Sequence, residues 1–225
     1  MIDWQAMRLT LELALLVAGA LFLLGLPVAY WLTFSRWRGK FLVEALVGLP
    51  LILPPTVLGF YLLVAFGSQS FVGRWYQSLT GHTLAFSFAG LVVGSILYSF
   101  PFAVQPFAAS FASVDRDLLA ASSILGASRW RTFRQVIIPL SVPGLITGVV
   151  LSFAHTVGEF GVVLMIGGNI PGVTRTISID IYDRVQAGEY ASANYTALVL
   201  LLFSFVVLAT VYGVNRKIWT VHSFQ

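Results

Sequence analysis

A histidine and an acid lie four residues apart inside a strongly apolar part of this chain. On a helix, His155 and Glu159 would lie on one face and could share a hydrogen bond. Zinc sites usually take at least three protein ligands, so this pair is too small for a metal site, and we expect none. A proton relay would need further carboxylates nearby, and none follows. We therefore expect Glu159, with its neighbour Phe160, to form a gate or to fix the helix, and His155 to be a polar residue that faces other helices.

Residues for covalent or ATP-dependent catalysis are missing from the sequence. It contains no cysteine, which excludes disulfides and thiolate metal sites, and we find no nucleophile–base pair. The phosphate-binding pattern G-x-x-x-x-G-K-[ST] does not occur, because the single Gly-Lys pair, Gly39 and Lys40, has Phe34 at the position of the first glycine. We therefore expect no catalytic residue and no cofactor in this chain, so that ATP and Mg²⁺ would bind to a partner.

The elements that position these residues must lie in lipid. The chain is 58% hydrophobic and 10% charged, whereas about 25% of the residues in an average soluble domain are charged. Five apolar stretches exceed the roughly 20 residues that a membrane-spanning helix needs; they cover residues 9–34, 41–66, 83–111, 140–168 and 191–214. Lipid offers the backbone no hydrogen-bond partner, so these stretches must be helices. The sequence predicts an all-α integral membrane protein whose residues 1–225 form a single transmembrane domain.

The basic residues between the predicted spans orient the chain. Most of the thirteen Lys and Arg residues follow the first, third and fifth spans: Arg36, Arg38, Lys40, Arg116, Arg129, Arg131, Arg134, Arg216 and Lys217. The others, Arg8, Arg74, Arg175 and Arg184, lie on the opposite side. Basic loops stay in the cytoplasm, so we expect a periplasmic N-terminus, a cytoplasmic C-terminus and a multi-pass location in a bacterial-type inner membrane. The net charge of +4 then reflects topology, and we expect membrane lipid rather than nucleic acid as a partner.

The connection between the third and fourth spans, residues 112–139, has the pattern of two short helices. Ser113 can cap the first helix, and Gly126 can end it. Ser128 can cap the second helix, which Pro139 would stop where the fourth span begins. The sequence therefore predicts a bent pair of helices on the cytoplasmic side.

Small side chains distinguish the first of these two helices. Ala120, Ala121 and Ser122 leave part of its surface almost without bulk, so another protein's backbone could approach closely and dock there. The alternative is a helix that rests on the membrane, with Arg129, Arg131 and Arg134 against lipid phosphates. These features alone do not decide between the two interpretations.

The spacing in this connection resembles the EAA loop of binding-protein-dependent ABC importer permeases, whose pattern is E-A-A, three residues, G, nine residues, I-x-L-P. The corresponding positions here are Ala120, Ala121, Ser122, Gly126, Val136, Ile138 and Pro139. Ala120 stands where the family often has Glu and Ser122 where it has Ala, so one charged contact of the family pattern is absent. The resemblance implies that this loop is a coupling helix, which sits in a groove of a cytoplasmic ATPase subunit and transmits its movements.

A second stretch, GEFGVVLMIGGNIPGVTRTISIDIY over residues 158–182, resembles the molybdate-type branch of that family, in which G-E-F-G-A and G-N-I-P-G-E-T-R-T recur. Val162 and Val173 depart from the pattern. The resemblance extends over most of the chain and implies the type I ABC importer permease fold and molybdate as the cargo, with tungstate as a second one. It also implies an outer loop that carries Asn169, Pro171 and Arg175.

Prolines interrupt the predicted second and third spans. Pro50, Pro54 and Pro55 fall in the second span, and Pro101 and Pro106 in the third. Each proline removes a backbone donor, and broken helices are tolerated in a membrane where they line a cavity. A packing kink is the alternative for any single proline. The cluster in the second span favours a translocation path or gate.

The family resemblance also implies the partners. They are a second copy of this chain, two cytoplasmic ABC ATPase subunits and a periplasmic oxyanion-binding protein. The cores of the predicted spans contain no Lys or Arg, so tight capture of an oxyanion must occur elsewhere, as it does in that family. Sulfate or another tetrahedral oxyanion is an alternative cargo. An ATP-independent carrier is a further alternative, but it would need coupling-ion ligands or inverted repeats, and the sequence has neither.

Overall fold

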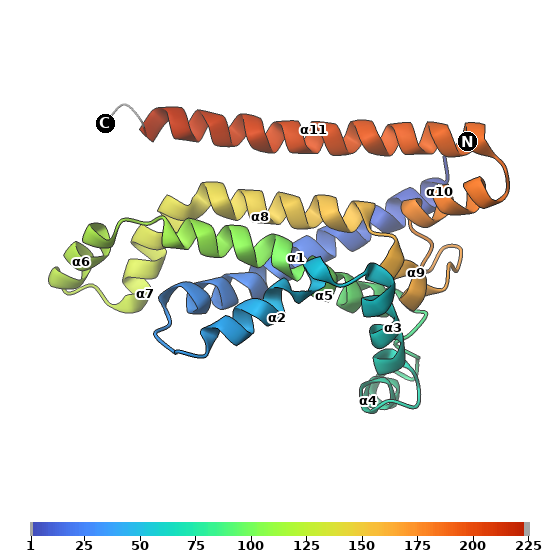
Figure 1. Cartoon of the computed structure of the whole chain (residues 1–225), viewed down its shortest axis with the longest axis horizontal. Coiled ribbons are helices and arrows are strands. Elements are labelled where there is room, and N and C mark those ends of the chain that lie inside the picture. Colours follow the sequence, from blue (N-terminus) through green and yellow to red (C-terminus); the bar gives the residue numbers. More distant parts are fainter. Residues whose placement is uncertain (1, 223–225) are drawn as a thin grey trace.

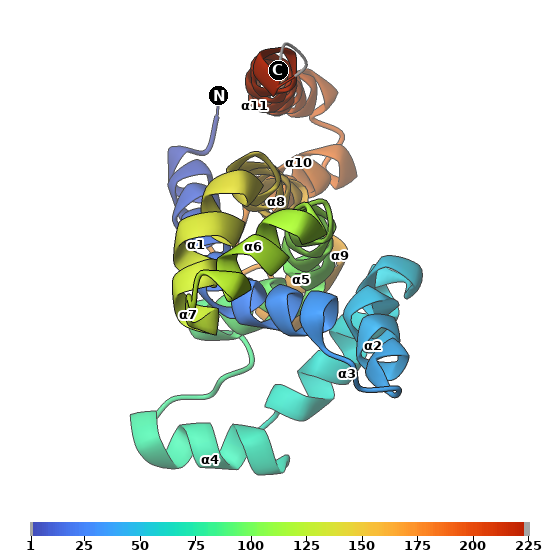
Figure 2. The ribbon, with the colours of Figure 1, turned by 90° about the vertical axis from the view of Figure 1, so that its left-hand side faces the viewer.

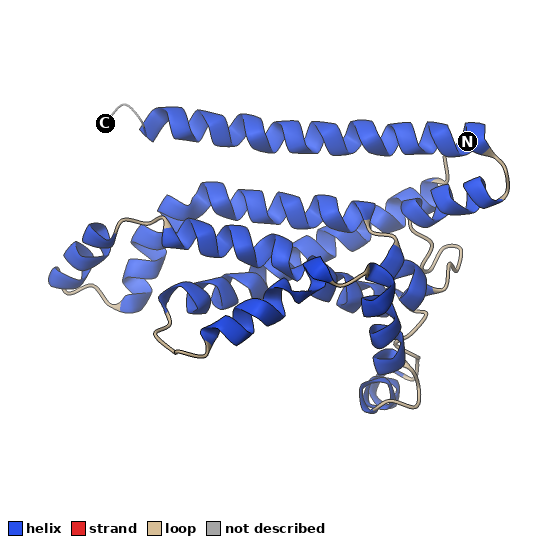
Figure 3. Cartoon of the chain, in the orientation of Figure 1, coloured by secondary structure: helices blue, strands red, loops and turns tan. Residues whose placement is uncertain are grey.

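The computed structural model describes residues 2–222, with side chains described up to Gly213, and this part of the chain is helical without strands (Figures 1 and 3). The helices are α1 (Trp4–Phe34), α2 (Lys40–Ile52), α3 (Pro55–Phe66), α4 (Phe71–Thr80), α5 (Phe88–Ala112), α6 (Arg116–Ile124), α7 (Arg129–Thr132), α8 (Ile138–Gly158), α9 (Gly161–Gly167), α10 (Ile177–Gln186) and α11 (Tyr190–His222). A π-helical turn, Phe133–Ile137, joins α7 to α8. The all-α prediction is confirmed for the described residues.

Helices α1, α5 and α8 form the packed centre of the bundle, and α11 runs along the outside of α8 (Figures 1 and 2). Helices α5 and α8 approach closely because Gly148 has no side chain: a Cβ there would lie 2.5 Å from a ring carbon of Phe107. Nearby, the hydroxyls of Ser110 and Ser141 each donate to the other residue's carbonyl oxygen (3.1 and 3.4 Å). Small residues and interhelical hydroxyl bonds of this kind are the usual means of helix association in lipid.

Among the described residues, four helical stretches are long and apolar enough to cross a membrane, and a bent pair of helices makes a fifth candidate. The pair is α2 and α3, whose axes differ by 110°. The expected second span, residues 41–66, is therefore a broken span or a re-entrant loop and not one straight helix. The break falls at Leu53 and Pro54, where Pro54 and Pro55 cannot donate backbone hydrogen bonds.

Two expectations about prolines were wrong. Pro101 and Pro106 do not interrupt the third span, because α5 is one continuous helix that contains both residues. Packing between α1 and α8 holds α5 in line in spite of the missing donors. Pro139 does not stop the second short helix either, because the helical run continues from Arg129 to Gly158. The π-helical turn changes the hydrogen-bond register just before Pro139, so the missing N–H falls at the junction.

The fourth span has a break that the sequence analysis did not anticipate. Helix α8 ends at Gly158 and α9 begins at Gly161, so Glu159 and Phe160 are the two residues between them. The hydroxyl of Ser178 donates to the backbone carbonyl of Glu159, which replaces a lost helical bond. Glu159 therefore lies in the break between α8 and α9 and not on the face of a continuous helix.

Candidate functional site

The two short helices between α5 and α8 form a hairpin at one end of the molecule (Figure 1). Helix α6 is capped by Asp115 and not by Ser113, which ends α5 instead. Gly126 ends α6 in the left-handed conformation (φ +76°), and the N–H groups of Gly126 and Ala127 donate to the carbonyls of Ser123 and Ser122 (3.0 and 3.1 Å). This is the Schellman arrangement that terminates many helices. Local hydrogen bonds therefore fix the direction of the bend.

The tip of this hairpin is an exposed apolar surface. Ile124 and Leu125 are 86% and 84% exposed, and Ala120 and Ala121 beside them are exposed too. Large apolar side chains at this exposure, next to residues without bulk, are typical of a surface that meets another protein or a membrane. Of the other residues in the pattern, Val136 and Ile138 pack partly against the core and Pro139 is exposed on the helix.

Ser122 links the two arms of the hairpin. Its hydroxyl lies 2.8 Å from the hydroxyl of Thr132, and Ser128 caps the second arm as expected by accepting the N–H of Arg131 (3.2 Å). The Ala-to-Ser departure from the family pattern therefore has a structural consequence, because it adds a hydrogen bond across the bend.

Ser122→Ala removes this bond and is expected to loosen the hairpin without unfolding it. A neutral hydrogen bond of this kind contributes about 1 kcal/mol, so we expect ATP-driven uptake to fall by less than about tenfold. Uptake rates in reconstituted vesicles would measure the effect, with Thr132→Val as the matched variant. Additive losses in the double variant would contradict a direct Ser122–Thr132 link.

A groove of three adjoining hollows runs along one face of α5. Tyr98, Phe102, Gln105, Ala109 and Ala112 recur every three or four residues and line it in turn. The hollow farthest from the hairpin measures about 500 Å³, the middle one about 380 Å³ and the one nearest the hairpin about 410 Å³. The middle and near hollows share Gln105 and Ala109, so they adjoin each other along α5. Along the groove, the α5 side chains that line it decrease in size, from aromatic rings at the far end to alanines at the hairpin end.

Aromatic rings separate the far hollow from the middle one. The His155 ring packs on the ring of Phe102 (centroids 3.9 Å apart) and on the ring of Tyr98 (4.8 Å). Tyr98 and His155 line the far hollow, whereas Phe102 lines the middle one. We call Tyr98, Phe102 and His155 the ring cluster. It lies where the groove would have to open for a solute to pass.

His155 is hydrogen-bonded to a neighbouring helix. Its Nδ1 lies 2.9 Å from the Ser99 hydroxyl, which also lies 3.0 Å from the Thr156 hydroxyl. Thr156 in turn donates to the Ser152 carbonyl (2.9 Å). The tautomer of His155 sets which atom of the His155–Ser99 pair donates. The expected hydrogen bond between His155 and Glu159 is therefore wrong, since the partner of His155 is Ser99.

Glu159 has no well-formed hydrogen bond in the described part of the chain. The residue is 3% exposed, and neither its carboxylate oxygens nor the neighbouring buried hydroxyl of Ser95 has a partner at hydrogen-bonding geometry. An unpaired buried acid is costly, which is typical of a position that changes its surroundings during function. Glu159 and Phe160 line the far hollow together with Pro55.

The prolines of the second span are divided between two places. Pro54 and Pro55 form the break between α2 and α3, and α9 packs on α3 so closely that a Cβ at Gly161 would lie 2.7 Å from Pro55 Cβ. Pro50 lies within α2 and lines none of the three hollows. The structure thus brings Pro55, Glu159 and Phe160 together at the far end of the groove, without Pro50.

Beyond α9, the loop residues form a charged network. Asn169, which has a left-handed backbone (φ +57°), donates to Asp183 (2.7 Å) and accepts from Arg175 (2.8 Å). Arg175 also pairs with Asp183 (3.5 Å), whereas Pro171 is exposed. In α10, the hydrogen bond to Asp180 raises the pKa of Arg184 above its usual value.

Comparison with known proteins identifies the fold. Residues 22–220 match the family described as "Binding-protein-dependent transport system inner membrane component". The chain belongs to this family. Two solved permease-containing assemblies share its fold: a bacterial alginate ABC transporter with its periplasmic protein (TM-score 0.76, 19% identity, 95% of this chain and 78% of that chain) and the inward-facing MetNI methionine ABC transporter (TM-score 0.73, 18% identity, 96% and 99%). The expected type I permease fold is confirmed.

The molybdenum permease relatives are similar to this chain in length. The chain is 52% identical to the "Molybdenum transport system permease protein ModB" of Azotobacter vinelandii over 95% of each chain. It is 36% identical to the protein of the same name from Escherichia coli K12 over 96% of each chain. A "Probable sulfate transport system permease protein cysT" of Chlorokybus atmophyticus is 34% identical over 85% of this chain and 65% of its own length. This permease is thus a multi-pass inner-membrane component of a transport system.

Sequence reasoning missed several residues of this permease. Ser99 and Phe102 contact His155 from another helix, 56 and 53 positions away in the chain, and no local pattern shows such contacts. Asp183 joins the outer loop from α10 in the same way. Gln105 did carry a signal, because it is a polar residue inside an apolar span.

Proposed function

We propose that this chain is the membrane permease subunit of an ATP-driven ABC importer for molybdate, with tungstate as a second cargo. The observation that carries the proposal is the hairpin, whose exposed Ile124 and Leu125 flank small residues at one end of the bundle. A motor subunit that binds there would move α8 directly, because α7, the π-helical turn and α8 form one helical run. The cargo is inferred from the 52% identical molybdenum permease and from the outer-loop sequence.

The proposed topology follows from the basic residues and from the hairpin. The hairpin end faces the cytoplasm and meets two ABC ATPase subunits, which bind ATP and Mg²⁺. The N-terminus and the outer loop with Asn169, Pro171 and Arg175 face the periplasm, where an oxyanion-binding protein docks. The chain itself then needs no catalytic residue, cofactor or metal, and residues 1–225 act as a single transmembrane domain.

A second copy of the chain completes the path. The three hollows lie open on one side of the bundle, so one chain supplies only part of a wall, and closed two-fold dimers are the commonest solution for such a shape. In the state described here the ring cluster blocks the path between the far hollow and the middle one. ATP binding would bring the hairpins of the two copies together and reverse this arrangement, with Pro54, Pro55 and Glu159 at the joints.

Reconstitution of the permease with its ATPase and binding protein tests this function. We expect uptake of labelled molybdate into vesicles to require ATP, and excess tungstate to compete strongly. Equal competition by sulfate would favour the sulfate alternative, which has weaker support because the sulfate relatives are less similar. Uptake by the permease alone, without ATP, would favour the carrier alternative and contradict the proposal.

A further inference from the structure

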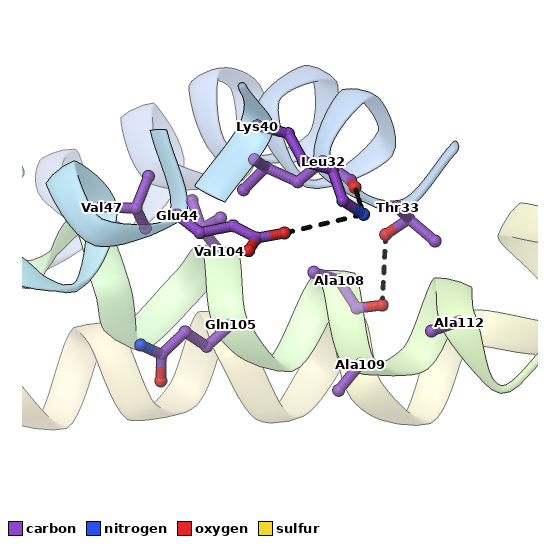
Figure 4. Close-up of a pocket in the computed structure, with 10 residues that line it drawn as sticks. All are labelled: Leu32, Thr33, Lys40, Glu44, Val47, Val104, Gln105, Ala108, Ala109 and Ala112. Carbon is purple, nitrogen blue, oxygen red and sulfur yellow. Dashed lines mark hydrogen bonds and ion pairs between the residues drawn. The ribbon is translucent and has the colours of Figure 1, made fainter. Parts of the chain in front are cut away.

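The hairpin end of the groove contains a cation that neither the family pattern nor the gate explains. Lys40 is the only Lys or Arg among the described residues that line the three hollows. It lies on α2, across the near hollow from α5, and Figure 4 shows its ammonium group turned toward Glu44 and toward the end of α1. The remaining groove offers an oxyanion no fixed positive charge.

The ammonium group of Lys40 has fewer hydrogen-bond acceptors than it has N–H donors. Nζ donates to the Leu32 carbonyl (3.2 Å), and its distance to Glu44 Oε1 is 3.7 Å, which is longer than a hydrogen bond. Since an ammonium group has three N–H donors, Lys40 retains capacity for another acceptor. The side chains of Lys40 and Glu44 are 39% and 48% exposed, and ion pairs at such exposure contribute about 0–1 kcal/mol. Another anion can therefore replace Glu44 at little cost.

The rest of the near hollow suits a small anion. Its volume of about 410 Å³ is more than ten times the roughly 30 Å³ that one water occupies, so a tetrahedral oxyanion fits with part of its hydration. Ala108, Ala109 and Ala112 keep the space open on the α5 side. Gln105 lines both this hollow and the middle one, and its amide has no hydrogen-bond partner among the described residues. It can donate to an oxyanion that moves from one hollow to the next.

We propose that Lys40 is the oxyanion contact at the exit of the groove, and that Glu44 is the counter-ion which the cargo displaces. A dianion attracts the ammonium group more strongly than one carboxylate does at the same distance, so the cargo replaces Glu44 on arrival. Glu44 then remains beside the bound anion and repels it, which favours release on the hairpin side. This inference rests on the proposed oxyanion transport and names the residues that bind the cargo last.

Uptake by the complete complex tests the role of Lys40. We expect Lys40→Gln to lower ATP-driven molybdate uptake about tenfold, and Lys40→Arg to retain most of it. The matched control is Arg38→Gln, because Arg38 is exposed in the same connection and lines none of the three hollows. Equal uptake by Lys40→Gln and Arg38→Gln would overturn the inference. Absence of ATP-driven uptake in the wild type would instead overturn the proposed function.

Glu44→Gln separates oxyanion binding from a structural role of Lys40. This variant leaves the bond from Lys40 to Leu32 in place and removes only the competing charge. We expect the oxyanion to stay longer at the exit, so uptake should become about tenfold more sensitive to unlabelled molybdate placed inside the vesicles. A purely structural pair would not change this sensitivity, and an unchanged value would overturn the inference even if Lys40→Gln failed to fold.

Discussion

Gly126→Leu is expected to lower ATP-driven uptake by about a hundredfold while leaving the transmembrane helices folded. The left-handed backbone at this position (φ +76°) costs a residue with a side chain about 1–2 kcal/mol. Within the chain a Cβ at Gly126 would meet nothing within 4 Å, so the remaining loss must come from the docked ATPase subunit. Insertion of bulk into a packed contact typically costs a further 1–3 kcal/mol. ATP-driven uptake would measure the total loss, and co-purification of the ATPase subunit would measure the loss of docking.

Gly81→Leu is the matched control for this variant. Gly81 also ends a helix with a left-handed backbone (φ +75°), and a Cβ there would also meet nothing within 4 Å. It lies after α4, at the end of the bundle away from the hairpin. The backbone penalty is thus the same and the docking contact is absent. Equal losses in the two variants would show that strain alone explains the effect and that the hairpin is not the docking surface.

The parts of this fold that depend on residues close together in the chain were predictable from the sequence. The apolar stretches became helices because lipid leaves the backbone no other partner, and Gly126 and Ser128 end and cap helices where expected. Pro101 and Pro139 were wrongly predicted to break helices. The helix around Pro101 continues because neighbouring helices pack against it, and the helix at Pro139 continues because a π-helical turn precedes the proline that lacks an N–H donor. The break at Glu159 had a signal that was overlooked, since Gly158 and Gly161 flank it.

The groove could not be predicted, because its residues come from helices that are distant in the chain. The sequence placed His155 and Glu159 on one face of a single helix, but the break at Glu159 separates them and Ser99 binds His155 instead. Lys40 was read only as a marker of topology. Its place in the near hollow depends on how α2 folds back along α5, and no pattern within α2 determines that.

Phe102→Ala is the second variant with a large expected effect. Phe102 contributes the ring that lies closest to His155 (centroids 3.9 Å) and is the member of the ring cluster that lines the middle hollow. Its removal joins the far and middle hollows into one passage. We expect molybdate to leak across vesicles without ATP at least about tenfold faster than through the wild type, which corresponds to a barrier lower by about 1.4 kcal/mol. Efflux from preloaded vesicles in the absence of ATP measures this rate.

Two controls decide whether the ring cluster blocks the groove by its bulk. Phe102→Leu retains most of the volume without the ring contact, so we expect it to leak little if bulk is what matters. Phe153→Ala removes an aromatic residue that faces Phe203 of α11 (centroids 6.3 Å) and lines none of the three hollows. Leak through Phe153→Ala equal to that through Phe102→Ala would indicate general loosening of the bundle. A tight Phe102→Ala permease would place the far gate elsewhere, with Glu159 and Phe160 at the break between α8 and α9 as the remaining candidates.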